Sequence, residues 1–97
     1  MIAKNVKENY NIENLLGSKA RVKILKILAK NEELSISQII RRTKLNHSSV
    51  KYHLACLKSY NLVQEKIFGR IKIYRYKFEN IRAKSLGKFI EIWEGGL

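Results

Sequence analysis

Hydrophobic and polar residues alternate at helical spacing through the first half of the chain. In the segment Lys19–Lys30, Val22, Leu25 and Leu28 recur every three residues, and lysines occupy the opposite side of the same helical wheel. Ser18 directly precedes the segment and is a favourable N-cap. The pattern therefore predicts an amphipathic helix that buries one side in a core.

One further helix is predicted on each side of this one. Asn5–Leu16 carries apolar residues at helical spacing, and Gly17 is expected to end that helix in the left-handed conformation. Ser35 and Gln38 form the S-x-x-Q pattern of a capping box, which predicts a helix from there to about Thr43.

A further helix follows a tight connection and continues to about Tyr60. Either Asn46 or Ser48 is suited to cap it. Three apolar residues lie on one side of this helix and are expected in the core: Val50, Leu54 and Leu57.

The period of the pattern then changes from helix to strand. Leu62–Phe68 and Ile71–Phe78 are rich in β-branched and aromatic residues, which favour strands. Between them, Gly69 and Arg70 suit a two-residue turn of type II′, which requires glycine first. A β-hairpin is therefore predicted.

A last helix is predicted over Asn80–Glu94, and the complete order of elements indicates the fold. Two short helices joined by a tight turn and followed by a hairpin are typical of a winged helix-turn-helix, in an α+β, mainly α chain. No proline-rich linker or repeat divides residues 1–97, so one domain is expected. Its helix-turn-helix and wing would occupy residues 18–78, and its terminal helices residues 1–17 and 79–97.

The charge is concentrated in the middle of the chain. The formal net charge is +12, and all of it falls in Ser18–Phe78, where fifteen bases face Glu32, Glu33 and Glu65. An excess of this size is typical of proteins that bind nucleic acid or an anionic membrane surface. The alternative is a lysine-rich surface that serves solubility alone. Both ends are electrically balanced, which indicates protein–protein packing.

The outer side of the fourth helix offers groups that read DNA. It holds no acid and no large aliphatic side chain, but it supplies hydroxyls, an ammonium, a phenol and a methyl group. Such groups hydrogen-bond base edges or contact a thymine methyl in the major groove. For the serines, helix capping alone is the alternative, and His47 would touch a phosphate. The predicted contact residues are His47, Ser48, Ser49, Lys51, Tyr52 and Ala55.

Cations around this helix are expected to hold the DNA backbone. Arg70 would sit at the hairpin tip, where it would enter a minor groove or lie along the phosphates. An ordinary solvated hairpin is the alternative. The predicted backbone and wing contacts are Arg41, Arg42, Lys44, Lys66, Arg70, Lys72 and Arg75.

Several other classes of function find no support in the sequence. No catalytic grouping is present, so an enzyme is not expected. The single Cys56 excludes an internal disulfide, and His47 and His53 lie six residues apart, which is not the spacing of a helical metal pair. His53 is instead expected to pack or hydrogen-bond within the motif. No cofactor or metal is expected. With no signal peptide and no apolar run of about 18 residues, a soluble, cytoplasmic protein is expected.

Several stretches resemble the ArsR-like winged-helix transcription regulators, in particular the small archaeal members. Leu16–Leu25 is similar to that family's LGSKxRxxIL entry, and Ser48–Leu57 is similar to its S-x-V-x-x-H-L-x-x-L recognition helix. Ile36–Ile40 and Leu62-Val63 resemble its next motifs, and the likeness runs from Leu15 to Phe78.

The chain also departs from that family in three places. Asn61 stands where the family usually has glycine before the wing, although asparagine tolerates the same left-handed conformation. Residues 37–43 contain no cysteine and residues 79–97 no histidine, so the ligands of metal-sensing members are missing and metal sensing is not expected.

The resemblance implies a DNA-binding homodimer held by the first and last helices. The balanced charge and apolar residues of both ends support the same arrangement. For the last helix, packing on the chain's own core is the alternative. The expected interface residues are Tyr10, Ile12, Leu86, Phe89, Ile90 and Trp93.

The leading hypothesis is therefore a sequence-specific regulator of transcription that binds double-stranded DNA as a homodimer. A chromatin-type protein that coats DNA with little sequence preference has the same charge requirement. A winged-helix module that binds a different protein through its last helix is a third reading.

Overall fold

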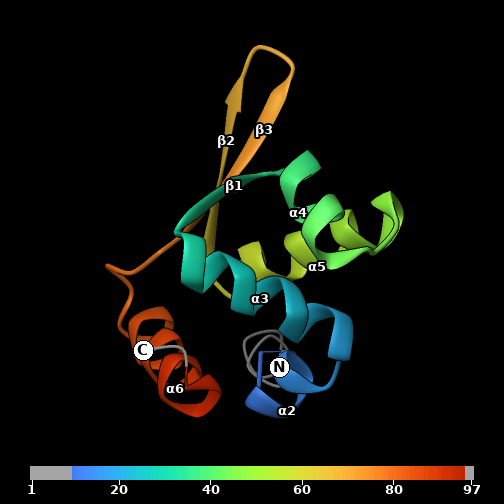
Figure 1. Ribbon diagram of the computed structural model, residues 1–97. Helices are drawn as coiled ribbons and strands as arrows, with labels where there is room; N and C mark the ends of the chain where they lie inside the picture. The colour runs from blue at the N-terminus through green and yellow to red at the C-terminus, as the bar shows by residue number, and fades with distance from the viewer. Residues whose placement is uncertain (1–9, 96–97) are drawn as a thin grey trace, which may run out of the picture.

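The computed structural model describes residues 10–95, whose elements follow the predicted order with one additional strand (Figure 1). Five helices and a three-stranded antiparallel sheet are present in that range. None of the helices in residues 10–95 is long and apolar enough to cross a membrane. The elements are α2 (Ile12–Leu16), α3 (Lys19–Asn31), β1 (Glu33–Ser35), α4 (Ile36–Thr43), α5 (His47–Ser59), β2 (Val63–Phe68), β3 (Ile71–Tyr76) and α6 (Ile81–Glu94).

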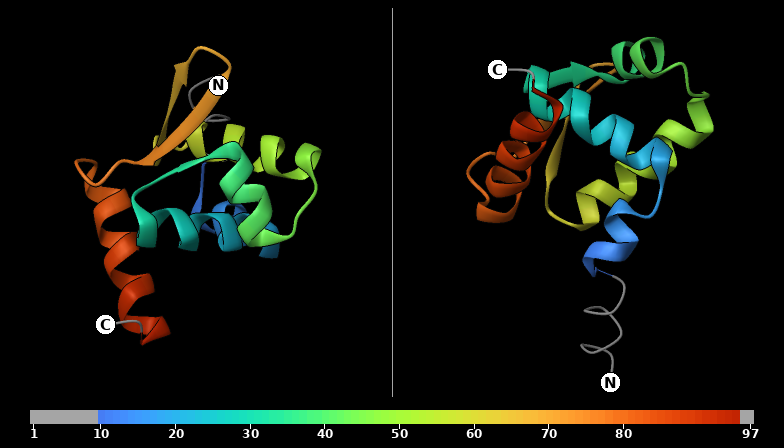
Figure 2. Two further views of the ribbon diagram at one scale, coloured as in Figure 1. Left: turned by 45° about the horizontal axis from the view of Figure 1, so that its top comes forward. Right: turned by 60° about the horizontal axis from the view of Figure 1, so that its bottom comes forward.

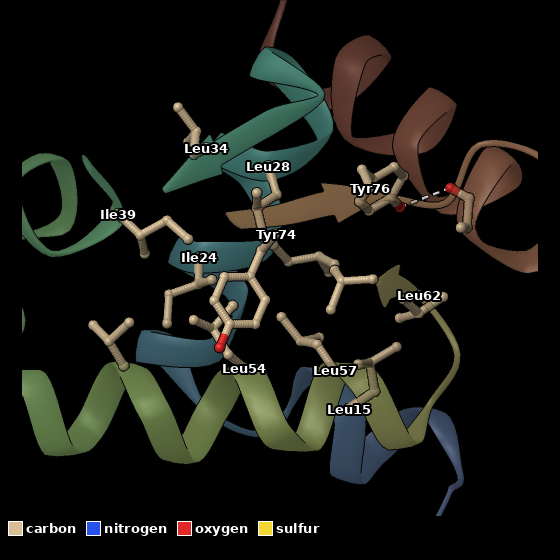
Figure 3. Packing of buried hydrophobic residues seen from close by; sticks show 14 residues of the cluster. Leu15, Ile24, Leu28, Leu34, Ile39, Leu54, Leu57, Leu62, Tyr74 and Tyr76 are labelled. Atoms are coloured by element: carbon tan, nitrogen blue, oxygen red, sulfur yellow. Dashed lines mark hydrogen bonds between the residues drawn. The ribbon is translucent and has the colours of Figure 1, made fainter. Parts of the chain in front are cut away.

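Helix α3 runs through the centre of the molecule and carries the core. Its apolar stripe is fully buried at Ile24, Leu25 and Leu28 and packs against α5 and the sheet (Figure 3). The predicted seam of α5 is buried as well, at Val50, Leu54 and Leu57. Burial of this apolar surface is the main stabilising term of the fold.

Strand β3 joins the sheet to the last helix. Tyr74 and Tyr76 alternate on the inner face of the strand and are buried. The Tyr76 hydroxyl donates a hydrogen bond of 2.7 Å to the carbonyl of Ala83 in α6 (Figure 3). Burial raises the pKa of Tyr76 to about 12, so this phenol remains a donor through the physiological range.

Side-chain caps fix where the helices begin, largely as predicted. The Ser18 hydroxyl accepts from the backbone amide of Arg21, and Ser35 and Gln38 form the complete capping box. At α5 the cap is Asn46, whose side chain accepts from the amide of Ser49 at 2.8 Å. The choice left open by the sequence between Asn46 and Ser48 is thereby settled.

The first predicted helix is wrong in its continuity through Tyr10 and Asn11, which are not helical, and in the role of its glycine. Within the described range α2 begins at Ile12, because the Asn11 side chain accepts from the backbone amide of Asn14 and caps the helix there. The predicted start at Asn5 lies outside the described residues. Gly17 has φ −78° and is not left-handed. A side chain there would instead place its Cβ 2.6 Å from the carbonyl oxygen of Glu13.

Strand β1 was not predicted, and it extends the hairpin to a sheet of order β1-β3-β2. It is three residues long, too short to show a period, and it pairs with the base of β3 through Leu34 opposite Tyr74. The predicted two-residue turn is confirmed, because Phe68 pairs with Ile71 and Gly69 has φ +61°.

The strands are slightly shorter than predicted. Leu62 precedes β2, and the pairing of β3 ends at Tyr76 rather than Phe78. Asn61 adopts the left-handed conformation with φ 65°, as expected of a residue that replaces glycine. The hairpin projects well beyond the helices (Figure 1). The architecture is the predicted winged helix-turn-helix.

Candidate nucleic-acid interface

The outer side of α5 is exposed along its length and opposes the buried seam. We call Ser48, Ser49, Lys51, Tyr52 and Ala55 the reading face. All are exposed except the half-buried Ser49, and Tyr52 keeps 61% of its surface accessible. Because Asn46 supplies the cap, helix capping does not account for the two serines. His47, the first residue of the helix, is exposed beside them.

Hydrogen bonds of Thr43 hold the connection between α4 and α5. Lys44 adopts the left-handed conformation with φ 63° and ends α4. The buried Thr43 hydroxyl donates to the carbonyl of Ile39 at 2.8 Å and accepts from the amide of Leu45 at 3.3 Å. The tight turn therefore fixes the angle at which α5 is presented, on the side of α3 away from α6 (Figure 2).

A buried arginine forms a hydrogen bond with the inner side of α5. The Nε of Arg21 in α3 donates to Nδ1 of His53 in α5 at 3.3 Å, and its Nη1 donates to the carbonyl of Asn14 in α2. His53 is buried, as predicted for a residue inside the motif. Burial, and secondarily the positive charge of Arg21, lower the pKa of His53. The imidazole is therefore neutral, with Nδ1 as the acceptor.

This lowered pKa predicts a loss of stability in mild acid. Below about pH 6.5 the unfolded chain binds a proton at His53 before the folded chain does, so the free energy of unfolding falls as the pH drops further. We expect urea unfolding at about pH 7.5 and about pH 5.5 to show this loss in the wild type. His53→Gln keeps an acceptor but cannot titrate, and its stability should change less between the two conditions. An equal change in both proteins would exclude His53 as the cause.

A second network sets the position of the hairpin relative to α5. Glu65 in β2 accepts from the hydroxyl of Tyr74 at 2.6 Å and from the ammonium of Lys58 in α5 at 3.0 Å. These two donors lower the pKa of Glu65, and burial together with the carboxylate raises the pKa of Tyr74. Sequence reasoning did not single out Glu65, because its partners come from two other elements.

The predicted backbone contacts fall into two groups. Two of them are held in ion pairs: Lys66 with Glu33 at 3.2 Å, and Arg75 with Glu79 at 2.7 Å. The Arg75 guanidinium lowers the pKa of Glu79 to about 2, so this pair is charged at neutral pH. Arg42 donates to the side chain of Asn31.

Five further cations of the predicted interface have no ion-pair partner among residues 10–95. Lys72 is half-buried and the others are exposed, so they are available to an anion. Four of them are predicted backbone contacts, at the end of α4 and at the end of the hairpin: Arg41, Lys44, Arg70 and Lys72. The fifth is Lys51 of the reading face.

The small residues of helix α6 face the core, whereas two of its aromatic side chains are exposed. Ala83 and Gly87 are buried against the sheet, where a side chain at Gly87 would bring its Cβ within 3.3 Å of the Tyr76 ring. Phe89 and Trp93 remain 54% and 75% exposed. Packing on the chain's own core therefore does not account for these two rings.

An apolar groove of about 300 Å³ lies between α6 and α3. The half-buried Leu86 and Ile90 line it, together with Phe89 and Trp93. Of the other predicted interface residues, Ile12 is 64% exposed and Tyr10 packs against the ring of Tyr60 at 5.2 Å. We define the apolar groove by Leu16, Val22, Leu25, Lys26, Leu86, Phe89, Ile90, Trp93 and Glu94.

Comparisons with known proteins agree with this fold. The family model described as bacterial regulatory protein, arsR family, matches residues 18–65, about half of the chain. HlyU from Vibrio cholerae is similar in structure, with 22% identity and a TM-score of 0.75 over 96% of this chain and 97% of that chain. The transcriptional repressor PagR of Bacillus anthracis has 21% identity and a TM-score of 0.70, covering 92% and 97%.

A possible transcriptional regulatory protein from Mycobacterium bovis, a fragment of residues 1–100, is also similar. It shares 25% identity at a TM-score of 0.67, with 82% of this chain and 83% of that chain covered. No curated protein matches the chain by sequence.

Proposed function

The chain belongs to the ArsR-like winged-helix regulators, which bind DNA to control transcription, and on that premise we propose that it is a sequence-specific homodimer. The observation that carries the proposal is the reading face. Exposed hydroxyl, ammonium and phenol groups cover one side of α5, and cations without ion-pair partners in residues 10–95 flank it.

In the proposed mechanism, the reading face contacts the bases and the cations at the end of α4 contact the DNA backbone. Lys51, Tyr52 and the serines of the reading face contact base edges in the major groove, where each base pair presents a distinct pattern of donors and acceptors. Arg41 and Lys44 neutralise phosphates beside that groove. These contacts fix the register of α5 but carry no sequence information.

The apolar groove supports the homodimer. Phe89 and Trp93 border it from α6 and are mostly exposed, although large aromatic side chains are usually covered in soluble proteins. A second copy of the chain would cover both grooves through a twofold axis, as is usual in homodimers. Lys26 and Glu94 form an ion pair of 2.8 Å at the rim.

The experiment that tests sequence specificity is selection from a pool of random DNA duplexes. We expect the purified protein to enrich a pseudopalindromic sequence and to bind it about 10³-fold more tightly than bulk DNA. If no sequence is enriched and all duplexes bind alike, the protein is of the chromatin type. Analytical ultracentrifugation of the same sample should show a dimer. A monomer at high concentration would favour a module that binds a different protein.

Within the proposed DNA interface, Arg70 and Arg75 are expected to contribute differently to the salt dependence of binding. Arg70→Ala should flatten the dependence of log affinity on log salt by about one unit per protomer, because one phosphate contact is lost. Arg75→Ala is the matched control, since Glu79 already neutralises that guanidinium. We expect it to change the slope less. The affinities of both variants, measured across a salt series, give the two slopes. Equal slopes would contradict the distinction between the ion-paired Arg75 and Arg70, which has no ion-pair partner among the described residues.

A further inference from the structure

The end of the hairpin exposes apolar residues that the proposed function does not yet use. We call Ile67–Ile71 the wing tip. Ile67, Phe68 and Ile71 are 61%, 58% and 57% exposed, three of the five residues in this short segment. No other labelled element lies beside the hairpin end (Figure 1). A cluster of exposed apolar side chains on a soluble protein usually marks a binding surface.

The strand register shows how these side chains are arranged. Phe68 pairs directly with Ile71, so both lie on one face of the hairpin, where they form an apolar pair beside the turn. Ile67 pairs with Lys72 and lies on the other face. The strand alternation that places Tyr74 and Tyr76 in the core therefore does not explain the apolar character of the tip.

The tip also carries positive charge. Arg70 occupies the turn, and Lys72 follows one residue after the apolar pair; neither has an ion-pair partner in the described part of the chain. Gly69 has φ +61° in this two-residue turn, a left-handed conformation that glycine adopts without strain. The wing tip is thus an apolar wedge with cations at its sides.

We propose that the Phe68–Ile71 pair inserts into the minor groove of the bound DNA at a base step and bends the duplex, with Arg70 and Lys72 on the flanking phosphates. The inference rests on the proposed function and deepens it, because it assigns a task to the wing beyond charge neutralisation. Apolar side chains wedged between base steps partly unstack them and bend the duplex toward the major groove.

One observation and one general argument favour DNA over an anionic membrane as the occupant. The Lys58–Glu65–Tyr74 network joins the hairpin to α5, so the wing and the reading face belong to one connected surface. A hairpin that enters the minor groove also has to widen it. Two strands lie about 4.8 Å apart before side chains are added, whereas the minor groove of B-DNA is about 6 Å wide. Entry of the tip therefore requires the groove to open, which bending provides.

The test measures DNA bending by energy transfer between dyes at the two ends of a duplex carrying the selected sequence. We expect the wild type to bend this duplex by about 20° or more. Phe68→Thr/Ile71→Thr places at both positions a β-branched residue, which strands favour. It should lose most of the bend and bind about tenfold more weakly, with an unchanged salt dependence. Arg70→Ala should show the converse: a flatter salt dependence with the bend retained.

Controls separate this inference from the proposed function. Ile81→Thr removes an equally apolar side chain that is 74% exposed at the start of α6, and it should bend DNA as the wild type does. If the double variant folds, binds and bends DNA like the wild type, the wedge is refuted and the proposed function stands. If the wild type does not bind the duplex but sediments with phosphatidylglycerol vesicles through the wing tip, both the wedge and the proposed function are refuted.

Discussion

Replacing Lys51 and Tyr52 together by alanine is expected to abolish most of the discrimination between the selected sequence and bulk DNA. Each good contact to a base edge contributes about 1–3 kcal/mol to discrimination, and a dimer makes every contact twice. We therefore expect the ratio of the two affinities to fall by about 100-fold or more. Binding to bulk DNA should weaken far less, since phosphate contacts supply most of it.

The fold of this double variant should be intact. Both side chains are exposed on α5, and substitutions at such positions usually change the free energy of unfolding by less than about 0.5 kcal/mol. Lys30→Ala is a suitable control, because it removes one exposed charge from α3, outside the reading face. If the double variant discriminates as well as the wild type does, α5 is not the element that reads the sequence.

Introducing charge at Phe89 and Trp93 is expected to separate the dimer into monomers. Phe89→Glu/Trp93→Glu places two carboxylates in the apolar groove of each protomer, where a dimer would bury them without partners. The isolated chain should fold, because both rings are more exposed than buried. Sedimentation should show a monomer. Affinity for the selected site should fall by about 10³-fold, since one half-site then binds alone.

The matched control for this variant lies on the same helix. Ile81→Glu introduces a carboxylate at an exposed apolar position that does not line the apolar groove, and this variant should remain dimeric. A dimeric Phe89→Glu/Trp93→Glu protein that still binds tightly would place the interface elsewhere on the molecule.

Elements with strong local signals were predictable within a residue or two. Helix α3 was expected over Lys19–Lys30 and ends at Asn31, because its cap and apolar stripe are both local features of the sequence. The capping box at Ser35 and the glycine of the hairpin turn are local in the same way. Strand β1 escaped prediction because it forms only by pairing with β3, a distant segment.

The candidate site was predictable only in part, for the same physical reason. The helical wheel of α5 separates Lys51 and Tyr52 from the buried seam without any tertiary information. The Arg21–His53 bond joins residues 32 positions apart, and no sequence spacing indicates it. The ion pair between Arg75 and Glu79 could likewise not be predicted from the sequence, because it depends on how the chain turns after β3.

The measurement that tests the central claim most directly is chemical footprinting of the dimer on its selected DNA. The account predicts two patches of major-groove protection about one helical turn, or about 34 Å, apart, each lost in the Lys51→Ala/Tyr52→Ala variant. It also predicts minor-groove protection beside each patch, lost when the wing tip is altered. Uniform protection without a period, or protection unchanged in the α5 variant, would contradict it.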